Sequence, residues 1–206
     1  MREGTPIGAL VRGLVAGTAG AGAQDGFFRA TARLAPEAPR VFEPRDPEQR
    51  EETALETTAR RLAALAGRPP LTREQKRRLA RWVHYGFGAA WGALYGLGHE
   101  SWRARRRWAG VLGFSTAVWM LGDNLLLAAL GLAAPPQKYP LRLHAYALAA
   151  HVAYGAAVAG SYRALDAACA TIAAWARPRF RSSAPRSART RARRSVGSRS
   201  ATSRCR

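Results

Sequence analysis

Six side chains that can carry a charge or form hydrogen bonds lie within long apolar stretches of this chain. They are Arg12, His84, Asp123, Asn124, His144 and His151. A polar group in apolar surroundings is costly unless it faces a partner, a cavity or water. Side chains of these types can relay protons, bind a solute or hydrogen-bond neighbouring helices. The sequence therefore predicts a polar network inside an apolar environment.

Asp123 lies deepest in its apolar stretch, and its expected partner is open among three side chains. Arg12, His84 and His151 are the candidates, although Arg12 could instead extend to the nearer membrane interface. In one interpretation these contacts only hold helices together. In the other, Asp123 and the adjacent Asn124 line a polar path with the two histidines, as in a small transporter or channel.

No cofactor, metal site or enzymatic activity is expected. Cys169 and Cys205 are the two cysteines, so no disulfide framework is implied. No His, Cys, Asp or Glu spacing within one helix is typical of a metal or haem ligand set. The sequence also lacks an activated nucleophile, a paired-carboxylate site and a phosphate-binding loop, and we therefore predict a protein that is not an enzyme.

Four segments rich in Ala, Gly and aromatic residues carry the polar groups. They cover about 7–23, 82–97, 108–134 and 143–162. Apolar stretches of roughly 17 to 25 residues match the hydrocarbon core of a bilayer when they are helical. We therefore expect an all-α fold, a polytopic membrane protein with a four-helix transmembrane bundle over residues 1–176.

The first loop, residues 25–81, carries signals for a helix at about 47–66. Asp46 suits the N-cap, Pro47 the first helical position and Gly67 the C-terminal stop. An apolar stripe at helical spacing is formed by Leu55, Ala59, Leu62 and Leu65. This pattern predicts an amphipathic helix that rests on the membrane surface or the bundle, or else forms a solvated arm.

The second apolar segment is expected to continue a helix that starts outside the bilayer. Thr72 and Gln75 have the spacing of a capping box just before it. Trp82 and Tyr85 could anchor its start at an interface, because aromatic side chains prefer that depth.

An internal repeat relates the second and fourth segments. HYGFGAAWGALY begins at His84 and HVAYGAAVAGSY begins at His151, with His, Gly, Ala, Ala and Tyr at matching positions. The matching His, Gly and Tyr project from almost one helix face. Two related hairpins would then make up the bundle. Weaker support comes from the Gly-rich first and third segments, which approach Asp25 at the close of the first and Asp123 within the third.

Small residues recur at four-residue spacing, which lets membrane helices approach closely. The predicted packing positions are Gly13, Gly17, Gly88, Gly92, Gly96, Gly155 and Ala159. They could pack against another segment of the same chain or against a second copy in a homo-oligomer.

Basic residues decide the expected orientation and partners. The net charge is +20, and residues 177–206 hold eleven Arg and no acidic residue. Such an Arg/Ser-rich segment is typical of a disordered tail that binds anionic lipid headgroups, with no specific nucleic acid expected. The short Arg-rich loop before residue 108 favours cytoplasmic termini, although the basic first loop conflicts with that orientation.

The Gly-rich first segment, PEAPRVFEP and HYGFGAAWGALYG together resemble the YagU-like group of bacterial inner-membrane proteins. The resemblance covers about residues 8–165 and leaves out the Arg/Ser tail. It implies an integral inner-membrane protein and carries over no catalytic residue. We expect a structural, accessory or stress-related role. The alternatives are a small transporter and a membrane-tethered binder of anionic lipid or nucleic acid.

Overall fold

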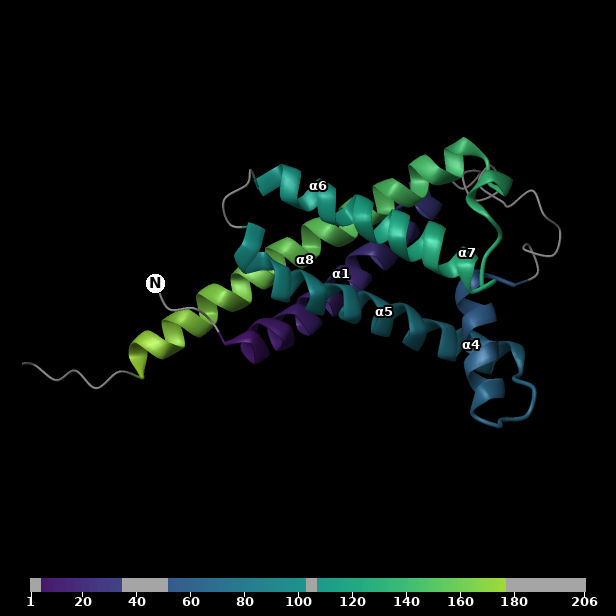
Figure 1. Cartoon of the computed structure of the whole chain (residues 1–206), viewed down its shortest axis with the longest axis horizontal. Coiled ribbons are helices and arrows are strands. Elements are labelled where there is room, and N and C mark those ends of the chain that lie inside the picture. Colours follow the sequence, from purple (N-terminus) through teal and green to yellow (C-terminus); the bar gives the residue numbers. More distant parts are fainter. Residues whose placement is uncertain (1–4, 35–51, 103–106, 177–206) are drawn as a thin grey trace, which may run out of the picture. The chain divides into compact units, whose positions relative to one another are not determined.

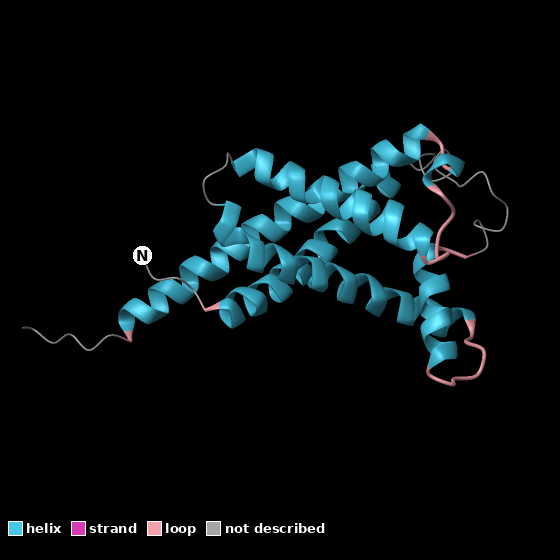
Figure 2. Cartoon of the chain, in the orientation of Figure 1, coloured by secondary structure: helices cyan, strands magenta, loops and turns pink. Residues whose placement is uncertain are grey.

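The computed structural model of the chain describes residues 5–34, 52–102 and 107–176, and within them all regular secondary structure is helical (Figure 2). The predicted all-α class is thereby confirmed for this part of the chain. The elements are α1 (Pro6–Leu34), α4 (Ala54–Leu65), α5 (Arg73–Trp102), α6 (Arg107–Ala117), the π-helix η1 (Val118–Leu126), α7 (Leu127–Ala129), the 3-10 helix η2 (Pro136–Lys138) and α8 (Leu141–Trp175). The chain divides into two compact units, residues 1–169 and 170–206. The cavity residues described for this protein all lie in the first unit.

All four predicted apolar segments lie in helices, but most helix ends differ from the prediction. The first helix continues to Leu34 and the last to Trp175, because alanine and other good helix formers follow the apolar residues. The third helix, made of α6, η1 and α7 and called α6–α7 below, ends at Ala129 rather than at residue 134. The reason is Gly131, whose φ of 63° suits glycine and closes the last turn.

Within the described residues, one helical stretch is long and apolar enough to cross a membrane. It is Gly110–Ala129 in α6–α7, with a mean hydropathy of 1.4 and 33% of its length buried inside the structure. The prediction of a membrane association thus has support from length and composition at one helix. The other three predicted spans do not meet this criterion.

Helices α1 and α5 cross with their backbones in direct contact. A Cβ atom added to Gly17 would overlap the carbonyl oxygen of Gly88, and one added to Gly92 would overlap the carbonyl oxygen of Gly13. A Cβ at Gly96 would likewise overlap the backbone of α1. Only residues without a side chain fit such a crossing, so the small-residue faces predicted from the sequence lie at this helix contact.

Helix α8 packs alongside α5 and runs in the same direction, whereas α1 and α6–α7 run the opposite way (Figure 1). The hydroxyl of Tyr154 donates to the carbonyl oxygen of Gly88 at 2.6 Å, and that of Tyr162 donates to Gly96 at 3.5 Å. Both tyrosines are almost fully buried. They join the two helices that carry the sequence repeat.

The helix in the first loop starts later than predicted. Glu52 and Thr53 are not helical, and α4 begins at Ala54 with Thr53 and Glu56 in a capping box. The predicted cap, Asp46, and the predicted start at residue 47 lie outside the described residues. Gly67 ends the helix as predicted, with φ 67° and backbone bonds back to the last turn.

The buried face of α4 also differs from the predicted apolar stripe. Ala59 and Ala63 are buried, whereas Leu62 and Leu65 are 49% and 86% exposed. Small residues allow α4 to lie close to α5, and the leucines at the edge of this contact stay outside it. The capping box of Thr72 and Gln75 is confirmed, with backbone-to-side-chain distances of 2.9 and 3.2 Å.

Candidate functional site

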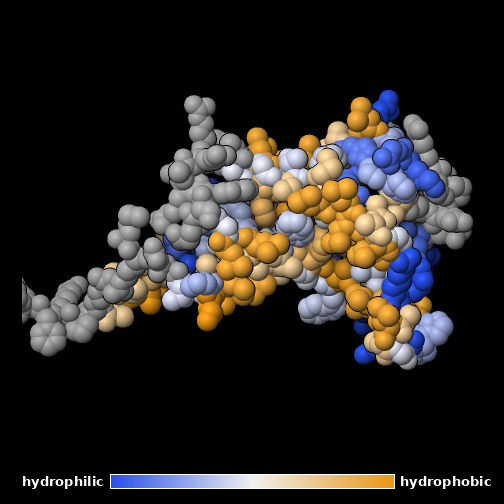
Figure 3. Space-filling view, in the orientation of Figure 1, coloured by the Kyte–Doolittle hydropathy of each residue, from blue (hydrophilic) through white to orange (hydrophobic). Residues whose placement is uncertain are grey.

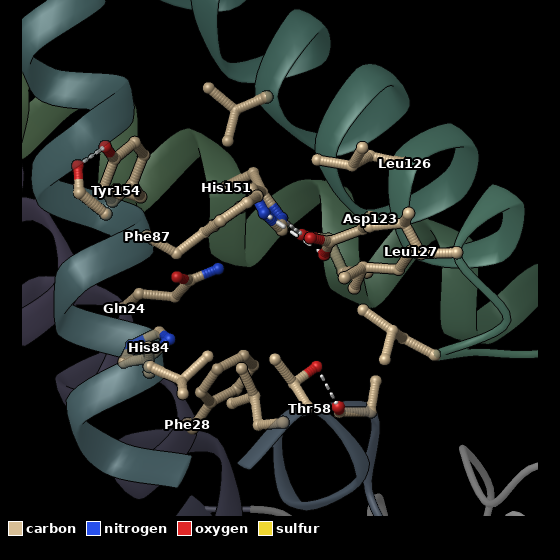
Figure 4. A pocket seen from close by; sticks show the side chains of 18 of the residues that line it. Gln24, Phe28, Thr58, His84, Phe87, Asp123, Leu126, Leu127, His151 and Tyr154 are labelled. Carbon is tan, nitrogen blue, oxygen red and sulfur yellow. Dashed lines mark hydrogen bonds and ion pairs between the residues drawn. The ribbon is translucent and has the colours of Figure 1, made fainter. Parts of the chain in front are cut away.

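A cavity of about 440 Å³ lies between α1, α5, α6–α7 and α8, with α4 at one side (Figure 4). Leucines, phenylalanines and other apolar residues make up most of its wall. Gln24, His84, Asp123 and His151 interrupt that wall. Thr58, Tyr146 and Tyr154 also line it, and their hydroxyls are hydrogen-bonded to Ala54, Thr31 and Gly88. Pockets with an apolar lining and a few convergent polar groups are the usual form of a small-molecule site.

Asp123 and His151 face each other across the gap between α6–α7 and α8. The Nε2 atom of His151 lies 3.3 Å from Oδ2 of Asp123. His151 is buried, with 8% of its side chain exposed, whereas Asp123 keeps 39% exposed and points into the cavity (Figure 4). Of the three partners open to Asp123 in the sequence, the structure selects His151.

A backbone contact indicates which ring nitrogen of His151 carries a hydrogen. The Nδ1 atom of His151 lies 2.8 Å from the carbonyl oxygen of Ala147, which can only accept, so Nδ1 carries a hydrogen. A neutral His151 would then present Nε2 as an acceptor to the carboxylate of Asp123, which also only accepts. A hydrogen bond between the two side chains therefore needs one more proton, on Nε2 or on the carboxyl group. With that proton the pair carries no net charge.

His84 makes the matching contact in the other hairpin. Its Nε2 atom lies 3.4 Å from Oδ1 of Asp25 and 3.4 Å from the carbonyl oxygen of Ala21. Asp25 also accepts a hydrogen bond of 3.0 Å from the hydroxyl of Tyr85. The sequence suggested that Asp25 marks a helix end, but α1 continues past it and Asp25 joins α1 to α5.

These contacts support the predicted repeat, because equivalent positions of the two hairpins meet in the same register. Gly17 lies eight residues before Asp25 and packs on the backbone of Gly88, four residues after His84. Ser115 likewise lies eight residues before Asp123. Its side chain would overlap a Cβ atom added to Gly155, which lies four residues after His151. Ala159, the counterpart of Gly92, is 1% exposed.

Gln24 is the cavity residue that the sequence did not single out. It is 7% exposed, and its carboxamide points into the cavity between His84 and His151 (Figure 4). No residue that the structure describes hydrogen-bonds to this carboxamide. The predicted first segment ended at residue 23, so Gln24 was placed outside the apolar region. The signal that could have placed Gln24 in the site was its position next to Asp25 in a helix that continues beyond the apolar segment.

Asn124 does not reach the cavity, although the sequence grouped it with Asp123. Its Nδ2 atom donates to the carbonyl oxygen of Trp119 at 2.9 Å within η1. A π-helix widens the helical turn and often occurs at functional sites. Here the wide turn lets Asp123 face α8 while Asn124 stays bonded to its own helix.

Arg12 and His144 are separate from the cavity. Arg12 lies 3.5 Å from Asp166 and over the ring of Tyr162, so the alternative that it pairs with Asp123 is wrong. His144 contacts the carbonyl oxygen of Pro136 at 2.9 Å, before the start of α8. Three of the six predicted polar residues therefore line one cavity, and the other three, Arg12, Asn124 and His144, make separate contacts.

The α4 helix closes one side of the cavity with Ala54, Leu55 and Thr58. Arg61 fixes its position by donating to the carbonyl oxygens of Leu130 and Gly131 at 2.8 and 2.9 Å. These carbonyls follow the last turn of α7 and have no helical partner, so a guanidinium suits them. The amphipathic arm is thus joined to the third helix.

Glu52 adds a second attachment, between α4 and α5. Its carboxylate accepts hydrogen bonds of 3.0 Å from both Arg60 and Lys76. Burial of Glu52 favours the protonated carboxyl, but the bonds from Lys76 and Arg60 and their charges outweigh it. The pKa of Glu52 therefore lies below its ordinary value.

Within the described residues, no group of three or more His, Cys, Asp or Glu side chains is arranged to hold a metal ion. No protein-family model, curated protein or solved structure matches this chain. The resemblance to the YagU-like group therefore stays a prediction. The function has to be argued from the cavity itself.

Proposed function

We propose that this chain is a multi-pass integral membrane protein of accessory character, and that its four-helix bundle holds a small molecule in the cavity. The observation that carries the proposal is the location of Gln24, His84, Asp123 and His151 in one otherwise apolar wall. A buried polar group is costly to maintain without a partner, and Gln24 has none among the described residues. A bound molecule would supply that partner.

Exposed apolar side chains support the membrane part of the proposal. Large hydrophobic residues are exposed along α1, α5 and α6–α7, including Ile7, Leu94, Leu112 and Leu125. Figure 3 shows apolar residues over the middle of the visible face and hydrophilic ones near α4. An extensive exposed apolar surface is unusual in a soluble monomer and suits contact with lipid tails. All four long helices would then cross the bilayer.

Membrane extraction tests this part directly. Full-length protein should remain in the membrane fraction after an alkaline carbonate wash and should dissolve only with detergent. Release by carbonate would overturn the integral membrane assignment. The inner or plasma membrane is the expected compartment, with both termini on the cytoplasmic side.

Cys169 offers a test of orientation, because it is exposed and follows the predicted fourth span. In a Cys205→Ser background, an impermeant maleimide should label Cys169 only after the cells are opened. Labelling of intact cells would place this end of α8 outside. The Cys169→Ser, Cys205→Ser double variant gives the background signal.

A small transporter is the second candidate, and the same cavity supports it. Asp123, His84 and His151 line it together, as a proton-linked path would need. Liposomes that contain the protein would then show solute or proton flux, and Asp123→Asn would abolish it. Absence of flux in liposomes whose protein is folded favours the binding role. The third candidate, a binder acting through the Arg/Ser tail, concerns residues 177–206, which lie outside the described part.

A further inference from the structure

We infer that the cavity takes a compact, membrane-soluble molecule that carries an uncharged hydrogen-bonding group, such as a hydroxyl or a carbonyl, and that Gln24 binds this group. The inference rests on the proposed binding function and names its ligand class. Gln24 is the key observation because the residue is only 7% exposed, and its carboxamide faces the cavity and has no partner among the described residues.

A carboxamide offers one acceptor oxygen and two donor hydrogens. Leaving them unbonded in an apolar cavity is unfavourable, so a group that can both accept and donate, or a carbonyl, would satisfy Gln24. The amide carries no charge and provides no compensation for a charged head group. Its chemistry favours a neutral ligand.

The remaining polar residues of the cavity also argue against a charged ligand. A hydrogen bond between Asp123 and His151 needs one proton beyond that on Nδ1, and the bonded pair then carries no net charge. His84 faces Asp25 on α1 through its Nε2 atom. No Arg or Lys belongs to the described lining, so a bound anion would lack a counterion. The carboxylate of Asp123 already faces His151, so it is not free to balance the charge of a bound cation.

The size and composition of the cavity define the rest of the molecule. Its volume of about 440 Å³ suits a body of one or two rings or a short branched chain. Phe28 and Phe87 lie near Gln24, Leu127 lies across the cavity beside Asp123, and all three supply apolar contact (Figure 4). A two-chain lipid is far larger than this space.

Three naphthalene probes separate these properties, because they share one ring system. 2-Naphthol carries a hydroxyl, naphthalene carries no polar group and 2-naphthoate is an anion. Saturable binding to the full-length protein in lipid nanodiscs would be followed by the rise in its unfolding temperature. We expect 2-naphthol to bind at least about tenfold more tightly than either of the others.

Gln24→Leu should remove this preference by weakening 2-naphthol about tenfold and leaving naphthalene unchanged or tighter. Gln137→Leu is the matched control, because Gln137 is exposed in η2 outside the cavity, and it should leave both affinities unchanged. Ala147→Phe should block all probes, because Ala147 lines the cavity and the larger side chain would fill it. Circular dichroism checks that each variant keeps its helices.

The outcomes separate this inference from the proposed function. Equal binding of 2-naphthol and naphthalene, both lost in Ala147→Phe, would overturn the hydrogen-bonding class and leave the cavity as a binding site. The same applies if Gln24→Leu keeps the preference or if 2-naphthoate binds most tightly. No saturable binding of any probe would overturn both the ligand class and the binding role, whereas release by alkaline carbonate concerns the membrane assignment alone.

Discussion

The Nε2 atom of His151 lies 3.3 Å from Oδ2 of Asp123, and the carbonyl oxygen of Ala147 holds the other ring nitrogen at 2.8 Å. The imidazole therefore has a partner at each ring nitrogen, and a hydrogen bond between the two side chains needs one proton beyond that on Nδ1. This contact links α8 to the π-helical turn of the third helix. It also decides how each partner responds to substitution.

Asp123→Asn should be tolerated better than removal of His151. An asparagine can donate to Nε2 of a neutral His151, so the change in the free energy of unfolding should stay below about 1 kcal/mol. His151→Leu leaves Asp123 without its partner and should cost on the order of 2 kcal/mol. Reversible unfolding in mixed micelles measures both values.

The double variant completes this test. Asp123→Asn with His151→Leu should cost less than the sum of the single changes, because the two residues interact directly. Additive costs, or an Asp123→Asn variant as unstable as His151→Leu, would show that the pair does not work as a neutral unit.

Gln24→Leu should stabilise the empty protein. Gln24 is 7% exposed and its carboxamide has no partner among the described residues, so an apolar side chain of similar size removes a desolvation cost of about 1 to 2 kcal/mol. The unfolding free energy without added ligand should rise, whereas the exposed Gln137→Leu control should change it by less than about 0.5 kcal/mol. A destabilised Gln24→Leu variant would mean that the amide is bonded in the protein.

Gly92→Ala should separate α1 from α5. A Cβ atom there would overlap the carbonyl oxygen of Gly13 and the backbone of Gly17, and neither can move without shifting a whole helix. We expect a loss of more than about 2 kcal/mol in the unfolding free energy. Gly86→Ala is the control on the same helix, because nothing lies within 4 Å of its added Cβ atom.

Gly86→Ala should be neutral or stabilising by up to about 1 kcal/mol, since alanine is the better helix former. Equal effects of the two alanine substitutions would show that the close crossing of α1 and α5 is not required. The comparison needs no assumption about the bilayer and can be made in detergent.

Acid should weaken the attachment of α4 through Glu52. Because its folded-state pKa lies below the ordinary value, the ionised carboxylate contributes stability at pH above the unfolded pKa, about 4.3. This contribution is lost as the pH falls through the lower folded pKa. At neutral pH it should amount to less than about 1 kcal/mol, because Arg60 is half-exposed.

The unfolding temperature of the wild type and of Glu52→Gln, compared between pH 7 and pH 3, measures this effect. The wild type should be the more stable protein at pH 7, and the difference should vanish at the acid end. A difference that grows on acidification would reverse the sign and contradict the role of Lys76 and Arg60 as partners of the ionised form.

Individual residues show how far the sequence could lead to the site. His84, Asp123 and His151 were recognisable because polar residues in apolar segments are exceptional, and all three line the cavity. Gln24 was missed because the apolar run ends just before it while the helix does not. Asn124 was included because it adjoins Asp123, but a π-helical turn directs its amide to Trp119 instead.

Helix starts that depend on side-chain caps were only partly readable from the sequence. Thr72 and Gln75 cap α5 as their spacing predicts. Thr53 and Glu56 cap α4, and the prediction that began at Asp46 did not single them out. Their capping-box spacing was the available signal.

The sequence by itself determined the helical class, the four apolar segments, the small-residue faces and the shared register of His84 and His151, because each depends on periodicity along one helix. The tertiary structure decided which polar groups meet. Asp25 pairs with His84, Asp123 with His151 and Arg12 with Asp166. Helix crossing and rotation set these distances between residues far apart in the chain, and the same packing leaves Gln24 facing a cavity without a partner among the described residues.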